Sequence, residues 1–198
     1  MPALIVHSHF HLIVFYVALL VCFGPEWIGT LFQRVEKGAV KRDRGSHLTL
    51  YVAMFAGVFV AFFFVNANLP GTTLTWSQPL QFWCGIALML AGLAFRWYAI
   101  RALGKFFTRT VATRAGQYVV DTGPYRLIRH PSYTGGLMMV LGTGIAMTNW
   151  ASLLTLMLGA LIGYAYRVRV EERALCADLG QPYRDYMRRT RRFIPFVW

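Results

Sequence analysis

Long apolar runs are the feature that most constrains the fold of this chain. Three of them, Phe10–Phe32, Leu48–Leu69 and Leu80–Ile100, extend over about 20 residues each. An apolar helix of about 20 residues is long enough to cross the hydrocarbon core of a bilayer, which is ~30 Å thick. The runs therefore predict three transmembrane helices in the first half of the chain.

A fourth apolar stretch, from Tyr133 to Val168, is interrupted only around Asn149. We interpret it as two helices that fold back on each other with the tip at Asn149. The arms from Pro131 to Asn149 and from Asn149 to Arg167 are each about 27 Å long at a helical rise of 1.5 Å per residue. The sequence thus predicts an all-α, polytopic membrane protein with five transmembrane helices, of which the fourth and fifth form a hairpin.

The distribution of charge separates this chain from soluble nucleic-acid-binding proteins. Its net charge of +12 would suggest a nucleic-acid partner if it were read alone. However, 57% of the residues are hydrophobic, only 14% are charged, and no Lys or Arg occurs before Arg34 or between Gly45 and Phe95. Such banding is typical of polytopic membrane proteins, and we expect no nucleic-acid partner.

The basic residues also predict the orientation of the spans, because Lys and Arg are enriched in cytoplasmic loops. They occur in three groups, after the first, third and fifth spans, namely Arg34, Lys37, Lys41, Arg42 and Arg44; Arg101, Lys105, Arg109, Arg114, Arg126 and Arg129; and Arg167, Arg169, Arg173, Arg184, Arg188, Arg189, Arg191 and Arg192. The other loops carry no charge. We therefore expect the N-terminus outside, a C-terminal helix in the cytoplasm and no cleaved signal peptide, and the arginine-rich face favours a bacterial inner membrane.

The segment Asp121–Tyr133, DTGPYRLIRHPSY, carries the first set of chemically informative residues. Pro131 pushes His130 out of the helical region and suits the first turn of a helix, so the fourth span is expected to begin there. Its free amides and positive dipole end favour an anion such as a carboxylate. Ordinary interfacial Arg, His and Tyr residues at a helix start explain this segment alone about as well.

The segment Tyr166–Arg173, YRVRVEER, carries the second set. Taken alone, Arg167 and Glu171 are a typical ion pair at a solvated helix end, since they are four residues apart. The antiparallel hairpin, however, brings Pro131 and Arg167 to the same face of the membrane. Ionisable groups that converge at a membrane surface indicate a functional site.

The remaining polar and cysteine residues receive simpler interpretations. The cysteines have no metal or redox spacing, and nothing near His7 and His11 completes a metal site, so no metal is expected. The arginines of the C-terminal tail are interpreted as a positive flank, and its tyrosines as lid or packing residues. Arg96, one turn from the end of the third span, is expected to snorkel to the lipid headgroups.

Taken together, these segments resemble the isoprenylcysteine carboxyl methyltransferase family of integral-membrane enzymes, which use S-adenosylmethionine. The resemblance extends from about Leu103 to Pro195. It rests on GPYRLIRHPSY at Gly123–Tyr133, the tip at Asn149, RVRVEE at Arg167–Glu172 and LGQPYRDY at Leu179–Tyr186.

The resemblance implies a set of site residues. The residues implied in cofactor binding are Gln117, Tyr118, Val119, Val120, Tyr125, His130, Pro131, Ser132, Tyr133 and Glu171. Arg167 is implied at the methyl acceptor. Family members often carry His or Arg where this chain has Gln117, which puts that side-chain contact in doubt. The division expected is a three-span membrane region at 1–100 and a catalytic region at 101–198.

The chemistry expected from the resemblance is methyl transfer to a carboxylate of a lipophilic small molecule or a lipidated acceptor. Arg167 would hold the carboxylate in a bidentate fork, and Glu171 would pair with the ammonium group of the cofactor. Three alternatives stay open. They are a sterol-reductase-like oxidoreductase that uses NADPH, a phospholipid N-methyltransferase, and a non-catalytic membrane scaffold.

Overall fold

The computed structural model describes residues 3–31, 40–41, 43–67, 69–108, 111–113 and 116–194. In chain order the elements are α1 (Leu4–His7), α2 (His9–Leu31), β1 (Val40–Lys41), α3 (Ser46–Ala67), α4 (Gln78–Leu103), η1 (Gly104–Phe106), β2 (Ala112–Thr113), η2 (Gly123–Arg126), α5 (Pro131–Ala146), α6 (Trp150–Leu179) and α7 (Gln181–Arg189). The predicted end of the first span, Phe32, lies outside the described residues, as do Arg34, Lys37, Arg42, Arg109 and Arg114.

The predicted multi-pass helical fold is confirmed, and the lengths of two helices differ from the prediction. Four helices are long and apolar enough to cross a membrane, namely α2, α3, α4 and α6. Helix α5 has only 16 residues, about 24 Å, because it ends at Ala146 rather than at the tip. Helix α6 continues without a break to Leu179, 12 residues beyond the predicted end at Arg167. Large apolar side chains such as Phe59, which is 77% exposed, face outward from the bundle, as expected in lipid.

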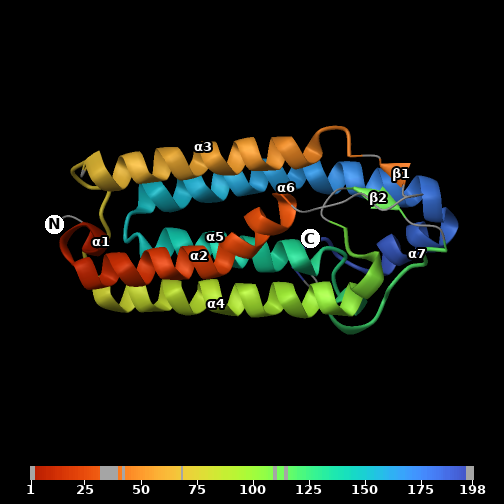
Figure 1. The fold of residues 1–198 in the computed structure, drawn as a ribbon, viewed down its shortest axis with the longest axis horizontal. Coiled ribbons are helices and arrows are strands. Elements are labelled where there is room, and N and C mark those ends of the chain that lie inside the picture. Colours follow the sequence, from red (N-terminus) through yellow and green to blue (C-terminus); the bar gives the residue numbers. More distant parts are fainter. Residues whose placement is uncertain are drawn as a thin grey trace.

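The hairpin tip lies where the sequence predicts it, and its polar groups are satisfied. Asn149 caps α6, because its side chain accepts a hydrogen bond from the Ser152 amide at 3.0 Å. Its side-chain amide donates to the Thr72 hydroxyl at 3.1 Å, and the Trp150 indole donates to the Gly71 carbonyl at 2.6 Å. The uncharged loop between α3 and α4 is therefore bound to the tip, at the end of the bundle opposite α7 (Figure 1).

Close helix packing places α5 inside the bundle. Helix α4 lies along α5, and α3 lies along α6 (Figure 1). A Cβ atom added to Gly85 of α4 would lie 2.5 Å from the Ala146 nitrogen, and one added to Gly142 of α5 would lie 2.6 Å from the Gly85 carbonyl oxygen. Gly159 packs in the same way against Ala53 of α3. Small residues at such seams let two backbones approach closely in lipid.

One pair of short strands joins two loops at the α7 end of the bundle, which the sequence did not predict. β1 and β2 pair antiparallel, with Val40 opposite Thr113 and Lys41 opposite Ala112. This pairing connects the segment before α3 to the segment after α4 (Figure 1). Val111, next to β2, packs with Val170 and Ala174 of α6, so both segments lie at the end of α6 that carries the predicted site residues.

We expect Gly85→Ala to destabilise the protein because its new methyl group would meet the backbone of α5. The expected loss is about 1–3 kcal/mol, as for other overpacked positions. Thermal unfolding of the purified protein in detergent measures it. The matched control is Gly24→Ala in α2, where an added Cβ meets no atom within 4 Å and alanine favours the helix. Equal stability of the two variants would contradict the close packing of α4 against α5 at Gly85.

Candidate functional site

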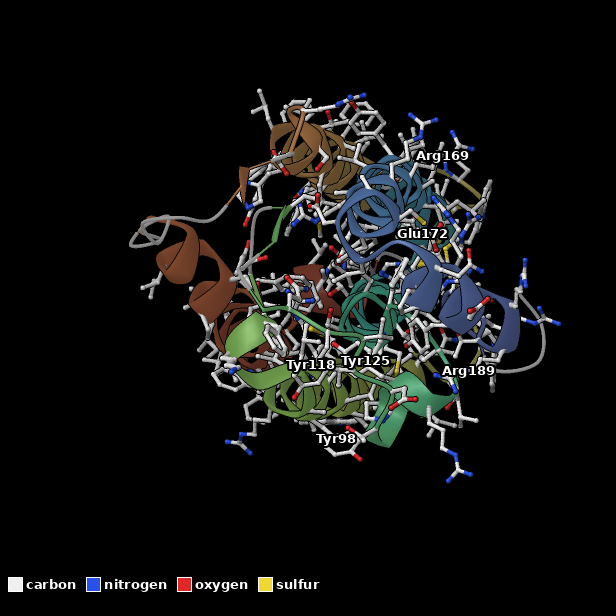
Figure 2. The ribbon with its side chains drawn as sticks, turned by 90° about the vertical axis from the view of Figure 1, so that its right-hand side faces the viewer. Tyr98, Tyr118, Tyr125, Arg169, Glu172 and Arg189 are labelled. Atoms are coloured by element: carbon white, nitrogen blue, oxygen red, sulfur yellow. The ribbon has the colours of Figure 1, made fainter. Side chains whose placement is uncertain are left out.

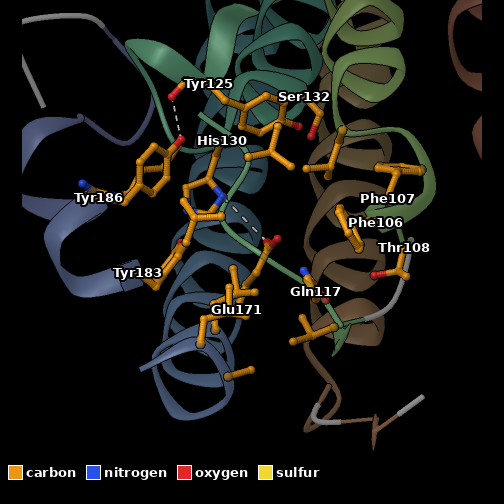
Figure 3. A pocket seen from close by; sticks show the side chains of 18 of the residues that line it. Phe106, Phe107, Thr108, Gln117, Tyr125, His130, Ser132, Glu171, Tyr183 and Tyr186 are labelled. Carbon is orange, nitrogen blue, oxygen red and sulfur yellow. Dashed lines mark hydrogen bonds and ion pairs between the residues drawn. The ribbon is translucent and has the colours of Figure 1, made fainter. Parts of the chain in front are cut away.

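A cavity of about 820 Å³ lies at the α7 end of the bundle, enclosed by α5, α6, α7 and the segments before η2 (Figure 3). Nine of the ten residues predicted for the cofactor line it, namely Gln117, Tyr118, Val119, Val120, Tyr125, His130, Ser132, Tyr133 and Glu171. Pro131 is not in the lining; it is buried and begins α5. The fold therefore brings together segments that are about 50 residues apart in the chain.

Tyr133 connects the two predicted segments directly. Its hydroxyl donates to Glu171 Oε2 at 2.6 Å and accepts from Arg167 Nε at 2.9 Å. The ring is 9% exposed and stacks on His130, with 5.4 Å between ring centroids and an interplanar angle of 6°. Figure 3 shows His130 beside Glu171, and the His130 Nδ1 to Glu171 Oε2 distance is 3.8 Å. The carboxylate of Glu171 is thus fixed from one side and faces the cavity from the other.

Arg167 lies behind Tyr133 and is not part of the cavity lining. It is 3% exposed. Its Nη1 atom lies 3.4 Å from both Asp43 Oδ1 and Ser46 Oγ, at the start of α3. The expected bidentate fork around an acceptor carboxylate is therefore not open to the cavity here, because Tyr133 and Asp43 hold the guanidinium.

Asp43 is a site-supporting residue that the sequence analysis missed. It accepts hydrogen bonds from the Ser46 hydroxyl at 2.8 Å, the His47 amide at 3.3 Å and the Val111 amide at 3.4 Å. Burial opposes ionisation of Asp43, but these hydrogen bonds and the charge of Arg167 outweigh it and lower its pKa below the ordinary value. The only sequence signal was the Asp43-x-x-Ser46 spacing before an apolar run.

Glu172, the second carboxylate of the pair, points away from Glu171 into an ionic cluster. It is 3.0 Å from Arg129 Nε and 2.9 Å from Arg192 Nη2, and His130 Nε2 is 3.4 Å away. Arg129 also donates to the carbonyls of Met187 and Thr190 at 2.8 and 2.7 Å. The cluster joins α6, the segment before α5 and the tail, so Arg192 has a structural role beyond that of a positive flank.

Helix α7 forms one wall of the cavity through Tyr183 and Tyr186, and the tail that follows it is hydrogen-bonded to the segment before α5. The Arg129 amide donates to the Arg191 carbonyl at 2.7 Å, and the His130 amide donates to the Arg192 carbonyl at 3.1 Å. Tyr186 donates to the Tyr125 carbonyl at 2.7 Å, a contact drawn in Figure 3. Burial raises the pKa of the Tyr183 phenol well above its ordinary value, so it stays neutral. These buried tyrosines pack in the cavity wall, in agreement with the predicted packing role.

The prediction that Arg96 snorkels to the headgroups is wrong. Its Nε and Nη2 atoms bind the Glu26 carboxylate of α2 at 2.8 and 2.9 Å, and its Nη1 donates to the Ser132 carbonyl at 2.8 Å. The Arg96 side chain is only 11% exposed. Helix α2 bends in its last turns (Figure 1), and it contains Pro25, which places Glu26 against α4. This ion pair supports the first turn of α5, whose Ser132 lines the cavity.

The sequence analysis also gave no indication that the aromatic residues after α4 line the cavity. Phe106 and Phe107 line the cavity together with Thr108. They follow Gly104, which ends α4 with a φ of 57°, a conformation that favours glycine. That glycine was the available signal for a sharp turn, but nothing in the local pattern predicts that the turn returns to the start of α5.

The family model described as phospholipid methyltransferase matches residues 80–181, slightly more than half of the 198 residues. The chain belongs to the phospholipid methyltransferase family. The match contains both predicted segments, the hairpin and all of the cavity lining except the tyrosines of α7.

Curated relatives of this chain are named protein-S-isoprenylcysteine O-methyltransferases, in agreement with the resemblance seen in the sequence. Protein-S-isoprenylcysteine O-methyltransferase B of Arabidopsis thaliana is 30% identical over 115 residues, 57% of this chain and 58% of the relative. Protein-S-isoprenylcysteine O-methyltransferase of Tribolium castaneum is 28% identical over 155 residues, 77% of this chain and 54% of the relative. The resemblance is confirmed, and the matches span little more than half the length of these relatives.

A solved structure has a similar fold. It is that of the eukaryotic intramembrane Ras methyltransferase, isoprenylcysteine carboxyl methyltransferase, with a TM-score of 0.58 and 23% identity. The alignment covers 95% of this chain and 63% of that chain. The similarity shows that the helical arrangement is shared.

We expect the fold to lose stability on acidification in a manner that depends on Asp43. The pKa of Asp43 is lowered in the folded state, so its stabilisation is present above the unfolded-state value of about 4 and is lost as the pH falls through the folded-state pKa. Asp43→Asn should be less stable at pH 7 and should show a shallower loss at acidic pH. Thermal unfolding midpoints between pH 7 and pH 3 measure the stability at pH 7 and its loss on acidification. If the midpoints of the two proteins fell in parallel, the proposed contribution of Asp43 would be contradicted.

Proposed function

We propose that this member of the phospholipid methyltransferase family is a membrane-embedded methyltransferase that uses S-adenosylmethionine and methylates a carboxylate of a lipophilic acceptor. The observation that supports it most is the Tyr133 hydroxyl, which links Glu171 in the cavity to Arg167 behind it. A scaffold whose charges only fixed its topology would have no need for a buried phenol and a buried guanidinium in series with a carboxylate that faces a cavity.

The lining of the cavity suits the chemistry of S-adenosylmethionine. Glu171 offers a carboxylate to an ammonium group, and Phe106, Tyr125 and Tyr183 provide aromatic walls for a nucleoside. Val119 and Val120 lie in an extended segment that can offer backbone groups.

The start of α5 has fewer free backbone amides for binding an anion than the sequence predicted. The amides of Tyr133 and Thr134 both donate to the His130 carbonyl, at 3.0 and 3.1 Å. They are therefore not free to bind a carboxylate. We propose that the carboxylate of the cofactor instead binds near Ser132, where the positive end of the helix dipole and a hydroxyl remain.

The protein residues have mainly positioning roles in this proposal. When bound, S-adenosylmethionine supplies an activated methyl group, and a carboxylate acceptor is already a nucleophile, so no general base is required. Glu171 orients the ammonium group, and the buried aromatic walls exclude water. We propose that Arg167 attracts the acceptor carboxylate to the Tyr133 side of the cavity, with Asp43 holding the guanidinium until the acceptor arrives.

We propose five membrane spans with α5 as the fourth, the N-terminus outside and α7 in the cytoplasm. Helix α5 can be short because α4 and α6 cover it, so little of it faces lipid. The cavity lies at the arginine-rich end, which the charge distribution assigns to the cytoplasm. The polar cofactor then enters from the cytosol and the lipophilic acceptor from the bilayer. The catalytic residues fall in 101–198, and the region 1–100 supports them through Glu26, Asp43 and Arg96.

One alternative has specific support. The family is named for phospholipid methylation, so transfer to a headgroup amine is the second candidate function. The positive charge of Arg167 favours a carboxylate acceptor over a headgroup amine, and the relatives described above are named as O-methyltransferases. We therefore place carboxylate methylation first.

Cofactor binding should depend on Glu171 and Tyr133. We expect Glu171→Gln and Tyr133→Phe to lower the affinity for S-adenosylmethionine by about ten- to a hundredfold, which corresponds to the loss of one charge-assisted hydrogen bond. Isothermal titration calorimetry in detergent measures this. Asp185→Asn, which removes a carboxylate outside the cavity, is the matched control and should bind normally. Unchanged affinity in both site variants would contradict the proposed binding mode.

The class of acceptor should be visible in the product. With tritium-labelled cofactor and a total lipid extract, we expect label in the organic phase that mild base releases as volatile methanol, because esters hydrolyse and N-methyl groups do not. Glu171→Gln serves as the background control. Label that survives base would exclude a methyl ester and contradict carboxylate methylation, and absence of transfer to any lipid or lipidated peptide would oppose methyl transfer.

A further inference from the structure

A second concavity, on the other side of α6 from the candidate site, is lined by arginines from three segments. It is a shallow depression that opens widely to solvent. Arg169 and Arg173 come from α6, Arg184 from α7 and Arg192 from the tail. We call it the arginine pocket. Figure 2 shows Arg169 and Glu172 on the same side of this end of the molecule.

The arginine pocket has an excess of positive charge. The acidic residue in its lining, Glu172, is already bound by Arg129 and Arg192. Arg169, Arg173 and Arg184 are exposed and have no ion-pair partner within the described part of the chain. Like charges that converge on one concavity repel each other, so an anion bound among them relieves that repulsion.

The depth of the arginine pocket matches that of lipid phosphates. From Trp150 to Arg169, α6 rises about 28 Å, close to the ~30 Å of the hydrocarbon core. Arg173 lies one turn further, at headgroup level. Leu158 and Ile162 lie on the α6 face that leads to Arg169, and they are 60% and 54% exposed. An apolar surface for acyl chains thus continues directly into a cluster of cations.

We propose that the arginine pocket binds the phosphate of an anionic glycerophospholipid from the cytoplasmic leaflet, with its acyl chains along Leu158 and Ile162. The guanidinium groups of Arg169, Arg173 and Arg184 contact the phosphate oxygens, for which arginine is well suited. The continuous apolar surface selects a lipid over free phosphate. The bound lipid also stabilises the tail, because Arg192 and Glu172 form one wall of the arginine pocket. This proposal does not depend on methyltransferase activity.

Native mass spectrometry of the detergent-purified protein tests the proposal, with phosphatidylglycerol and phosphatidylcholine of identical acyl chains as probes. We expect tighter binding of phosphatidylglycerol. Each arginine near the surface contributes roughly fivefold to the affinity for an anionic lipid, so the triple variant R169Q/R173Q/R184Q should lose about a hundredfold and retain no preference. Millimolar inorganic phosphate should not displace the lipid.

The matched control removes the same charge elsewhere at this end of the molecule. R101Q/R126Q/R188Q changes three exposed arginines outside the arginine pocket and should keep the preference for phosphatidylglycerol. Equal loss in both triple variants, equal binding of the two lipids, or displacement by inorganic phosphate would each overturn the proposal. If the pocket triple fails to fold in a thermal unfolding assay, R173Q alone decides, since its expected loss is about fivefold and an unchanged affinity would overturn the proposal.

Discussion

Charged side chains inside an apolar bundle must have partners, and this requirement organises the protein. An unpaired buried ion costs several kcal/mol, so each one fixes the segment that satisfies it. Arg167 of α6 is held by Tyr133 of α5 and by Asp43 before α3. Arg96 of α4 is held by Glu26 of α2 and by the Ser132 carbonyl. The two arginines therefore connect five segments, and both connections end in the first turn of α5.

The glycine seams complement these ionic connections. Gly85 against α5 and Gly159 against α3 let the backbones of the paired helices come into close contact. Close approach alone does not set the register of a helix pair in lipid, because apolar surfaces are equally satisfied by acyl chains. The buried polar contacts supply the register, and the seams supply the packing. Together they hold the Tyr133 hydroxyl of α5 within hydrogen-bonding distance of Arg167 and Glu171 of α6.

The local sequence pattern predicts a large part of this structure. The features that it did not predict are contacts between residues far apart in the chain. The apolar runs located the long helices, Asn149 located the tip, and the Pro131 start and Glu171 were placed together by the hairpin. The resemblance added the Gln117–Val120 segment, which has no signal of its own. The Arg96–Glu26 pair, separated by 70 residues, and the Asp43–Arg167 pair, separated by 124, have no local signature. Arg96 was misassigned because a cation near a span end fits snorkelling and burial equally well.

The two adjacent glutamates show how one helix serves two surfaces. Successive residues of an α-helix point about 100° apart, since there are 3.6 residues per turn. Glu171 therefore faces the cavity with Ala174 and Leu175, whereas Glu172 faces the arginine pocket with Arg173 and Cys176. His130 lies 3.8 Å from the first carboxylate and 3.4 Å from the second. One imidazole therefore lies between the two carboxylates. The acidic pair, with His130 between its members, is where the candidate site and the arginine pocket come closest along α6.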